Sequence, residues 1–127
     1  MNQRTTLLTG IVFGGLAVAI GAFGAHALKP ILEENARAET YELAVRYQFY
    51  HAFAILFSGV LMFHFPSRHM NRAVICFTSG IVIFSGSLYV LSLSGITMLG
   101  AITPIGGLLL ITGWLLLFLG INAKRGH

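Results

Sequence analysis

Charged side chains are scarce in this sequence. Asp, Glu, Lys and Arg together make up 9% of the 127 residues, whereas hydrophobic residues make up 56%. Soluble domains carry roughly 25% charged residues, so this composition is typical of a protein whose solvent is lipid. The net charge of +4 does not indicate a nucleic-acid partner, because the Lys and Arg residues are scattered and form no basic patch. We therefore expect an integral membrane protein.

Cysteine is almost absent as well. The single cysteine, Cys76, excludes an internal disulfide and a zinc or iron–sulfur site built from cysteines. The sequence contains no Walker, dinucleotide-binding, G-x-S-x-G or H-E-x-x-H pattern, and no charged residue falls within its long apolar runs. Intramembrane charges mark many proton-coupled transporters, so their absence argues against that class. We expect no catalytic residue, metal site or cofactor; an enzyme is disfavoured although not excluded.

Three uncharged runs predict the membrane-crossing segments. Residues 7–28 and 47–65 are each long enough for one helix, since about 20 residues span the hydrocarbon core. The run 73–123 is long enough for two, and Gly95 and Pro104 mark the divide between them. We therefore predict a single all-α domain, residues 1–127, with four transmembrane helices. Their ranges are about 7–28, 41–65, 73–93 and 102–123, and Thr40 or a neighbour is expected to cap the second.

The first apolar run also resembles a secretory signal peptide. Arg4 precedes it, and Ala25-His26-Ala27 mimics a small-x-small cleavage site. The run is longer than the usual apolar region of about 7–15 residues, which favours an uncleaved helix.

The distribution of Lys and Arg predicts the orientation, because short loops rich in these residues stay in the cytoplasm. One face of the predicted topology holds cations without any acid: Arg4, Arg68, Arg72, Lys124 and Arg125. The other face holds fewer cations, all beside the acids of the first loop: Lys29, Arg37, Arg46, Glu33, Glu34, Glu39 and Glu42. Both termini are therefore predicted to be cytoplasmic.

Small residues at regular spacing predict where the helices approach each other, since lipid provides no hydrophobic drive for their association. In the last helix, glycines recur every seven residues and share one face. Glycines at seven-residue spacing in the first helix and a glycine in the third extend the pattern. The predicted packing glycines are Gly14, Gly21, Gly86, Gly106, Gly113 and Gly120. This pattern favours a compact bundle. The alternative explanation of the pattern is that glycine is simply common in membrane helices. Trp114 is expected to face lipid.

Polar residues near the outer ends of the predicted helices form the candidate site. They are His26, Tyr50, His51, Ser87, Tyr89 and Thr103, all placed by the topology in the same half of the bilayer. One interpretation is a pocket in which His26 and His51 bind haem or a metal, or in which a quinone headgroup lies between His and Tyr. The other is that these groups link helices by hydrogen bonds. Two histidines without a carboxylate or cysteine partner make a weak metal site, which favours the second interpretation.

Four short segments occur in order along the chain and together resemble the domain of unknown function 423 family. They are Gly21-Ala22-Phe23-Gly24-Ala25-His26, Tyr47-Gln48-Phe49-Tyr50-His51-Ala52, Gly86-Ser87-Leu88-Tyr89 and Ile102-Thr103-Pro104-Ile105-Gly106-Gly107. The resemblance covers nearly the whole chain. Members are small bacterial inner-membrane proteins, with a eukaryotic relative called transmembrane protein 256. The resemblance therefore implies four transmembrane helices in the plasma membrane, and it implies no activity or catalytic residue.

Three functions follow from these observations. The first requires the fewest specific sequence features. It is a non-catalytic protein that contacts membrane lipids and binds or scaffolds a membrane-protein partner. The second is a small transporter or channel, which would have to form a homo-oligomer because four helices packed through glycines leave little room for a pore. The third is a protein that binds haem, a metal or a quinone through His26 and His51.

Overall fold

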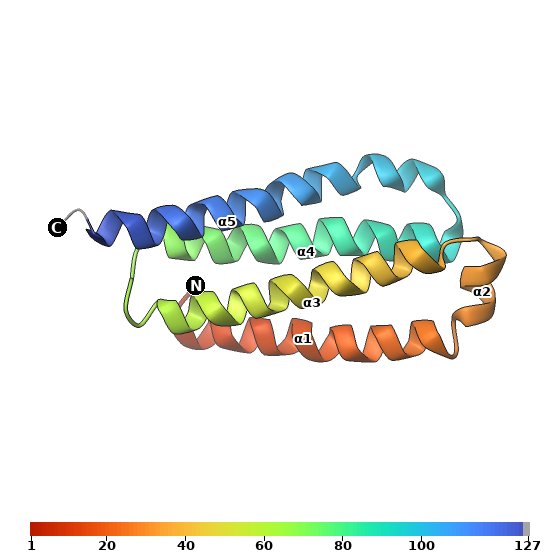
Figure 1. Ribbon diagram of the computed structural model, residues 1–127, viewed down its shortest axis with the longest axis horizontal. Helices are drawn as coiled ribbons and strands as arrows, with labels where there is room; N and C mark the ends of the chain where they lie inside the picture. The colour runs from red at the N-terminus through yellow and green to blue at the C-terminus, as the bar shows by residue number, and fades with distance from the viewer. Residues whose placement is uncertain (126–127) are drawn as a thin grey trace.

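The computed structural model describes residues 1–125, and in this range the chain is helical apart from its connections (Figure 1). Within these residues there are four long helices, α1 (Gln3–Ala25), α3 (Ala38–Leu61), α4 (Arg68–Ser94) and α5 (Thr103–Arg125). The short helix α2 (Lys29–Glu34) connects α1 to α3, and the 3-10 helix η1 (Thr97–Ala101) connects α4 to α5. Gly126 and His127, which the predicted domain includes, lie outside the described residues.

Local sequence explains where several helices begin and end. Asn2 caps α1, because its side-chain oxygen accepts a hydrogen bond from the Thr5 N–H at 2.8 Å. Ser67 caps α4 in the same way. Gly95 ends α4 with a φ of 74°, in the left-handed region that glycine adopts readily. Pro104 lies in the first turn of α5, where no intrahelical N–H bond is lost.

The observed helix ends differ from the predicted ranges by a few residues. α1 and α4 begin about one turn earlier than predicted, since their capping residues precede the first apolar residue. The expected cap at Thr40 is wrong, because α3 begins at Ala38 with Arg37 before it. The helix α2 was not predicted, although Pro30 in its first turn is a recognised start signal.

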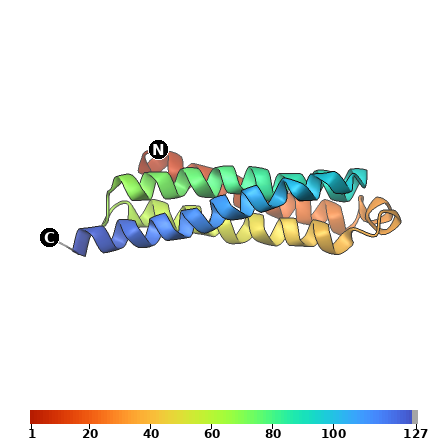
Figure 2. The ribbon, with the colours of Figure 1, turned by 90° about the horizontal axis from the view of Figure 1, so that it is seen from above.

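The long helices lie antiparallel in a staggered row (Figure 1, Figure 2). α1 packs on α3, α3 on α4 and α4 on α5, so each long helix packs mainly on its neighbours in the sequence. Within residues 1–125, the edge helices α1 and α5 make no extended contact with each other. The structure is therefore more open than the compact bundle that the glycines predicted, because α3 and α4 separate the two edges.

Three segments are long and apolar enough to cross a membrane: Gln3–Ala25, Arg68–Ser94 and Thr97–Ala123, the last combining η1 with most of α5. α3 is not among them, because Arg46, Gln48 and His51 lower its mean hydropathy. The outward faces of the edge helices are apolar, as contact with lipid requires. They include Ile11, Val12, Val18 and Phe23 of α1 and Leu108, Ile111, Leu115 and Phe118 of α5.

The hydrophobic core lies between α3, α4 and α5, nearer to the connection from α3 to α4. Phe77 and Val74 of α4 are fully buried in it. The other members are Ala54, Ile55, Met70, Ala73, Ile81, Leu110 and Leu117. Buried apolar side chains are therefore concentrated in this part of the row, and the groove between α3 and α5 described below borders it at Leu110.

Candidate functional site

Glycines set the closest approach between α4 and α5. A Cβ at Gly106 would overlap the backbone nitrogen of Phe84, and a Cβ at Gly113 would lie 2.6 Å from the ring of Phe77. Gly120 continues the series beside the N-cap of α4. Each step of seven residues along α5 is matched by a similar step back along α4, as antiparallel packing requires. Gly106 therefore leaves room for the backbone of α4 at Phe84, and Gly113 leaves room for the ring of Phe77.

A second set of glycines lies between α1 and α3. Gly14 and Gly21 face α3, and a Cβ at each would lie 3.9 Å from the Ala52 Cβ and 3.3 Å from the Val45 Cγ1, respectively. The sequence prediction missed several tighter glycines, because the partner of each is a large side chain rather than another small residue. They are Gly10 and Gly24 of α1, facing Leu56 and Tyr41, and Gly80 of α4, facing Leu110 of α5. Gly59 of α3 also lies close to a large side chain, that of Leu7.

The predicted packing role of Gly86 is wrong in this structure. Apart from the adjacent residues and backbone of its own helix, no described atom lies within 4 Å of a Cβ placed there. At 3.6 residues per turn, Gly86 lies about 200° around α4 from Phe84, which faces Gly106. Spacing identified a small residue but not the direction in which it points.

Gln48 links three helices. Its Nε2 donates a hydrogen bond to the Phe13 carbonyl of α1 at 2.9 Å, and its Oε1 accepts one from the Tyr89 hydroxyl of α4 at 2.6 Å. Sequence reasoning selected Tyr89 and missed Gln48. A lone amide in an apolar helix was the available signal, because an unpaired amide away from water is strongly unfavourable.

Two further side-chain hydrogen bonds connect neighbouring helices. Ser87 of α4 and Thr103 of α5 lie 2.7 Å apart between their hydroxyl oxygens. Ser85 donates to the Ala44 carbonyl of α3 at 2.7 Å. Gln48, Tyr89, Ser85, Ser87 and Thr103 thus form bonds between helices rather than lining one empty pocket.

His51 lies near the middle of α3 and is buried. Its Nδ1 is 2.7 Å from the Tyr47 carbonyl oxygen, and its Nε2 is 3.1 Å from the Trp114 Nε1. A carbonyl only accepts and an indole N–H only donates, so the imidazole is neutral, with its proton on Nδ1. Both ring nitrogens are occupied. Trp114, expected to face lipid, is half exposed but tied to α3 through this bond.

His26 and His51 do not face a common site. The His26 ring is exposed after the end of α1, and its Nδ1 lies 3.0 Å from the Ala22 carbonyl of the same helix. Gly24, two residues before His26, lies against Tyr41 of α3, which is about 15 Å along the helix from His51. A haem or metal held by both imidazoles does not fit this geometry. Among residues 1–125, no three His, Cys, Asp or Glu side chains lie together as metal ligands do.

A groove of about 510 Å³ lies between α3 and α5, beside the His51–Trp114 bond; we call it the aromatic groove. Its lining residues are Tyr47, Tyr50, His51, Gly107, Leu110, Ile111 and Trp114. Tyr47 stacks on Phe84 of α4 with 4.8 Å between ring centroids. Tyr50 is exposed, and in the described part of the chain neither the Tyr47 nor the Tyr50 hydroxyl has a hydrogen-bond partner.

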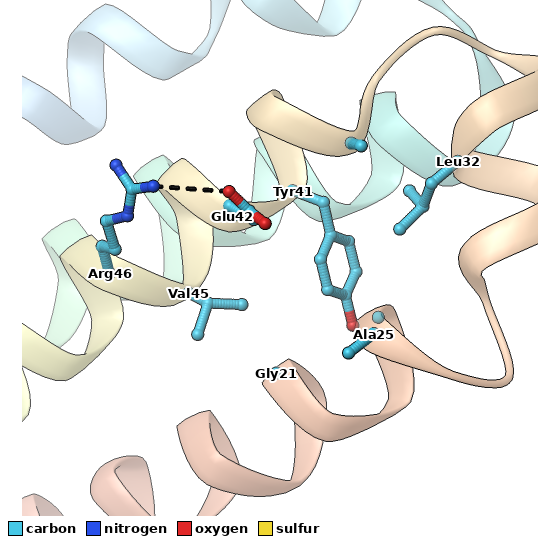
Figure 3. Close-up of a pocket in the computed structure, with 9 residues that line it drawn as sticks. Gly21, Ala25, Leu32, Tyr41, Glu42, Val45 and Arg46 are labelled. Atoms are coloured by element: carbon cyan, nitrogen blue, oxygen red, sulfur yellow. Dashed lines mark hydrogen bonds and ion pairs between the residues drawn. The ribbon is translucent and has the colours of Figure 1, made fainter.

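A second cavity of about 350 Å³ lies between α1 and α3, at the end closed by α2; we call it the end cleft (Figure 3). Figure 3 shows the Tyr41 side chain pointing from α3 toward α1. Leu32 lies on the side of the cleft next to α2. The Tyr41 hydroxyl donates to the Ile20 carbonyl at 2.5 Å. Glu42 and Arg46 lie at the rim of the cleft and form an ion pair at 3.3 Å. This cleft has both apolar walls and opposite charges.

Comparison with known proteins decides the family. A family model described as a protein of unknown function, DUF423, matches residues 20–107, which is more than half of the chain. This chain belongs to the DUF423 family. The matched residues of this DUF423 protein include Glu42, Arg46, Gln48 and His51, and Trp114 follows them.

Curated relatives cover nearly all of this DUF423 protein. The UPF0382 membrane protein SH2409 of Staphylococcus haemolyticus is 43% identical over 117 residues, which are 92% of this chain and 94% of the relative. The UPF0382 membrane protein YwdK of Bacillus subtilis is 36% identical over 116 residues, 91% and 94% of the two chains. The UPF0382 inner membrane protein YgdD of Escherichia coli strain K12 is 35% identical over 126 residues, 98% and 95% of the two chains. No solved structure matches the chain.

These relatives and the three apolar segments establish the location. This DUF423 protein is a multi-pass protein of the bacterial inner membrane. The printed names of the relatives give no substrate, partner or activity.

Proposed function

We propose that this protein crosses the inner membrane four times, with both termini in the cytoplasm, and acts there as a non-catalytic binding protein. α3 is the crossing that hydropathy alone leaves out. It lies beside α1 along its length, since Gly59 is near Leu7 at one end and Gly24 is near Tyr41 at the other. A helix placed between two membrane-spanning neighbours shares their depth.

The two faces of α3 support this placement. Gln48, His51 and Ser58 are buried against other helices, where hydrogen bonds satisfy them. Beyond Tyr50, the exposed face of the same helix is apolar and consists of Phe53, Phe57 and Val60. Gln48 and His51, which lower the hydropathy of the helix, therefore point away from lipid.

Cysteine labelling tests the topology. In a Cys76→Ser background, Glu34→Cys between α1 and α3 should react with an impermeant thiol reagent added to intact cells, whereas Asn71→Cys near Arg68 and Arg72 should react only after lysis. The reverse pattern would place the termini outside. Labelling of both residues on the same side would exclude a crossing by α3.

The aromatic groove is the observation that carries the binding function. It is open between α3 and α5 near the middle of both helices. Its wall carries aromatic rings together with the unpaired hydroxyls of Tyr47 and Tyr50. Rings stack on planar ligands, and phenol O–H groups donate to carbonyl oxygens. A hydrophobic ligand with a carbonyl-bearing ring, which is the chemistry of a membrane quinone, matches both properties.

His51 takes a supporting part in this site. Because its two nitrogens are bonded to Tyr47 and Trp114, the imidazole fixes the indole at the groove wall rather than binding the ligand directly. The quinone alternative predicted from sequence is therefore supported by the tyrosines, whereas its haem and metal versions have no ligand set here.

The only tryptophan of the chain, Trp114, lines the groove and reports on its occupancy. A benzoquinone with a short alkyl tail, added to the detergent-solubilised protein, should quench Trp114 fluorescence to saturation. Tyr50→Phe should weaken the apparent affinity about fivefold, because a hydrogen bond contributes about 1 kcal/mol. Phe53→Leu, on the exposed face of α3 outside the groove, is the matched control and should leave the affinity unchanged.

Two results would contradict quinone binding. One is quenching that rises linearly with quinone concentration, as expected for collisions within a micelle. The other is an equal response of the Tyr50 and Phe53 variants. Either would leave a scaffolding role as the better explanation of the groove. A single mass corresponding to the monomer in lipid would count against the oligomeric transporter.

A further inference from the structure

One face of α4 is not covered by another helix. Within residues 1–125, α4 packs mainly on α3 and α5, with smaller contacts to η1 and α2 (Figure 1). The uncovered face can be followed along α4 in steps of four and three residues, which keep to one side of an α-helix. We call this face the outer strip. From the start of the helix, its members are Arg68, Arg72, Ile75, Ser79, Val82 and Gly86.

The outer strip is cationic at the start of α4 and lacks charge further along. Arg68 and Arg72 are exposed and lie one turn apart. The Ile75 side chain is also exposed, and outside its own helix Gly86 has open space where a Cβ would be. At 1.5 Å per residue, Gly86 lies about 21 Å beyond Arg72. A bilayer with its headgroups is about 40–45 Å thick, so the strip covers the depth of one leaflet.

The two arginines have no acidic partner in the described part of the chain. All four acids of the sequence lie between residues 33 and 42, and Glu42 pairs there with Arg46. Among residues 1–125, neither the Arg68 nor the Arg72 guanidinium forms an ion pair. Arg68 is also the first residue of α4, where the helix dipole disfavours a cation and favours an anion. A bound anion would satisfy both the guanidinium groups and this end of the helix.

We propose that the outer strip binds an anionic phospholipid. The phosphate lies on Arg68 and Arg72, because guanidinium N–H groups donate well to phosphate oxygens. Long side chains of a helix point back toward its N-terminus, so both guanidinium groups reach toward the headgroups. One acyl chain runs along Ile75, Ser79 and Gly86.

The order of these groups matches the lipid. Phosphate followed by acyl chain is the order of a phospholipid from water inward, and cation followed by uncharged strip is the order along α4 from its start. The match holds for whichever leaflet contains the start of α4, because it is counted from the end of the helix. This site is separate from the aromatic groove and does not rest on the quinone proposal.

Three phospholipids test the role of charge. Phosphatidylglycerol, phosphatidylethanolamine and phosphatidylcholine all contain a phosphate, but the last two also carry a cation that the arginines repel. Native mass spectrometry of the full-length protein, released from detergent with equal amounts of the three lipids carrying matched acyl chains, measures retention of each. We expect phosphatidylglycerol to be retained about fivefold over each of the others, which corresponds to one contact between a basic residue and an anionic lipid.

Variants assign the site to the arginine pair. Arg68→Gln and Arg72→Gln should each lower the preference for phosphatidylglycerol, and the double variant should abolish it. Arg4→Gln is the matched control. It removes one cation from the same end of the row, but α1 carries no other Lys or Arg, so the wild-type preference should remain. The exchange Asn71→Arg with Arg72→Asn keeps the net charge but moves one cation about 100° around α4, and it should behave as Arg72→Gln.

Several results would overturn the proposal. Equal retention of phosphatidylglycerol and phosphatidylethanolamine by the wild-type protein would remove the site. An equal effect of Arg4→Gln and Arg72→Gln, or an exchange variant that behaves as the wild type, would indicate a general charge effect. Lipid-free dimers that Gly86→Leu dissociates would show that a second copy of the chain covers the outer strip instead. Circular dichroism and thermal unfolding verify that the helices of each variant are intact, and the exchange variant replaces Arg72→Gln if that variant does not fold.

Discussion

The two sides of α4 are built from different chemistry. Against α5, the contact depends mainly on shape, because Gly106 admits the backbone of α4 at Phe84. Against α3, hydrogen bonds from Ser85 and Tyr89 add polar links between the helices. A notch of this kind tolerates no added volume, whereas a single interhelical hydrogen bond in a membrane contributes on average about 0.6 kcal/mol. We therefore expect added volume at α4–α5 to destabilise the protein more than loss of one polar group at α3–α4.

The largest effect is expected at the α4–α5 notch. Gly106→Leu should lower the free energy of unfolding in detergent by about 3 kcal/mol or prevent folding, because overpacking against backbone is not relieved by a rotamer change. Gly86→Leu is the matched control on the other helix, with open space in place of a contact. It should change stability by less than about 0.5 kcal/mol. Equal losses in the two variants would refute the shape-based interface.

A smaller effect is expected at Gln48, which carries links to both α1 and α4. Gln48→Leu should destabilise by about 1–2 kcal/mol, since it removes two interhelical bonds and leaves their partners unpaired. Tyr89→Phe removes only one of these links and should cost about 0.6 kcal/mol. Because the two residues share a bond, the double variant should lose less than the sum of the single variants. Strict additivity in thermal or denaturant unfolding would show that the bond is not formed.

The smallest effect separates bonds between helices from bonds within one. Ser85 and Ser92 are both buried on α4, but Ser85 donates to the Ala44 carbonyl of α3 and Ser92 to the Leu88 carbonyl of its own helix. Ser85→Ala should reduce stability by about 0.6 kcal/mol, and Ser92→Ala should be nearly neutral. A larger loss at Ser92 would mean that burial, rather than the interhelical bond, decides the cost.

The difference between spacing within one helix and contact between two helices explains what could be predicted from sequence. Helix positions follow from the length of the apolar runs, and the glycines at 106, 113 and 120 share a face because of their spacing alone. Spacing within one helix does not identify the partner, so Gly86 was given a contact that it lacks. The staggered row was missed for the same reason, since nothing in one helix indicates how many neighbours it has.

The polar links were harder to predict because each depends on two helices at once. Gln48 donates to a backbone carbonyl of α1, which has no signature in the sequence. His51 was grouped with His26 by estimated depth, whereas its partner is Trp114, a residue whose apolar neighbours suggested only lipid contact. Depth along the membrane can be counted from the sequence, but the direction in which a side chain leaves its helix depends on the neighbouring helices.

The serial order of the row also determines how the protein can assemble. α3 packs on α1, α4 on α3 and α5 on α4, so every main interface joins helices that are consecutive long segments of the chain. Synthesis proceeds from the N-terminus, and each new helix therefore finds its partner already synthesised. No interface has to wait for a distant segment, and the loops to be closed are short. The row can therefore grow one antiparallel helix at a time, with each helix packing against the one synthesised before it.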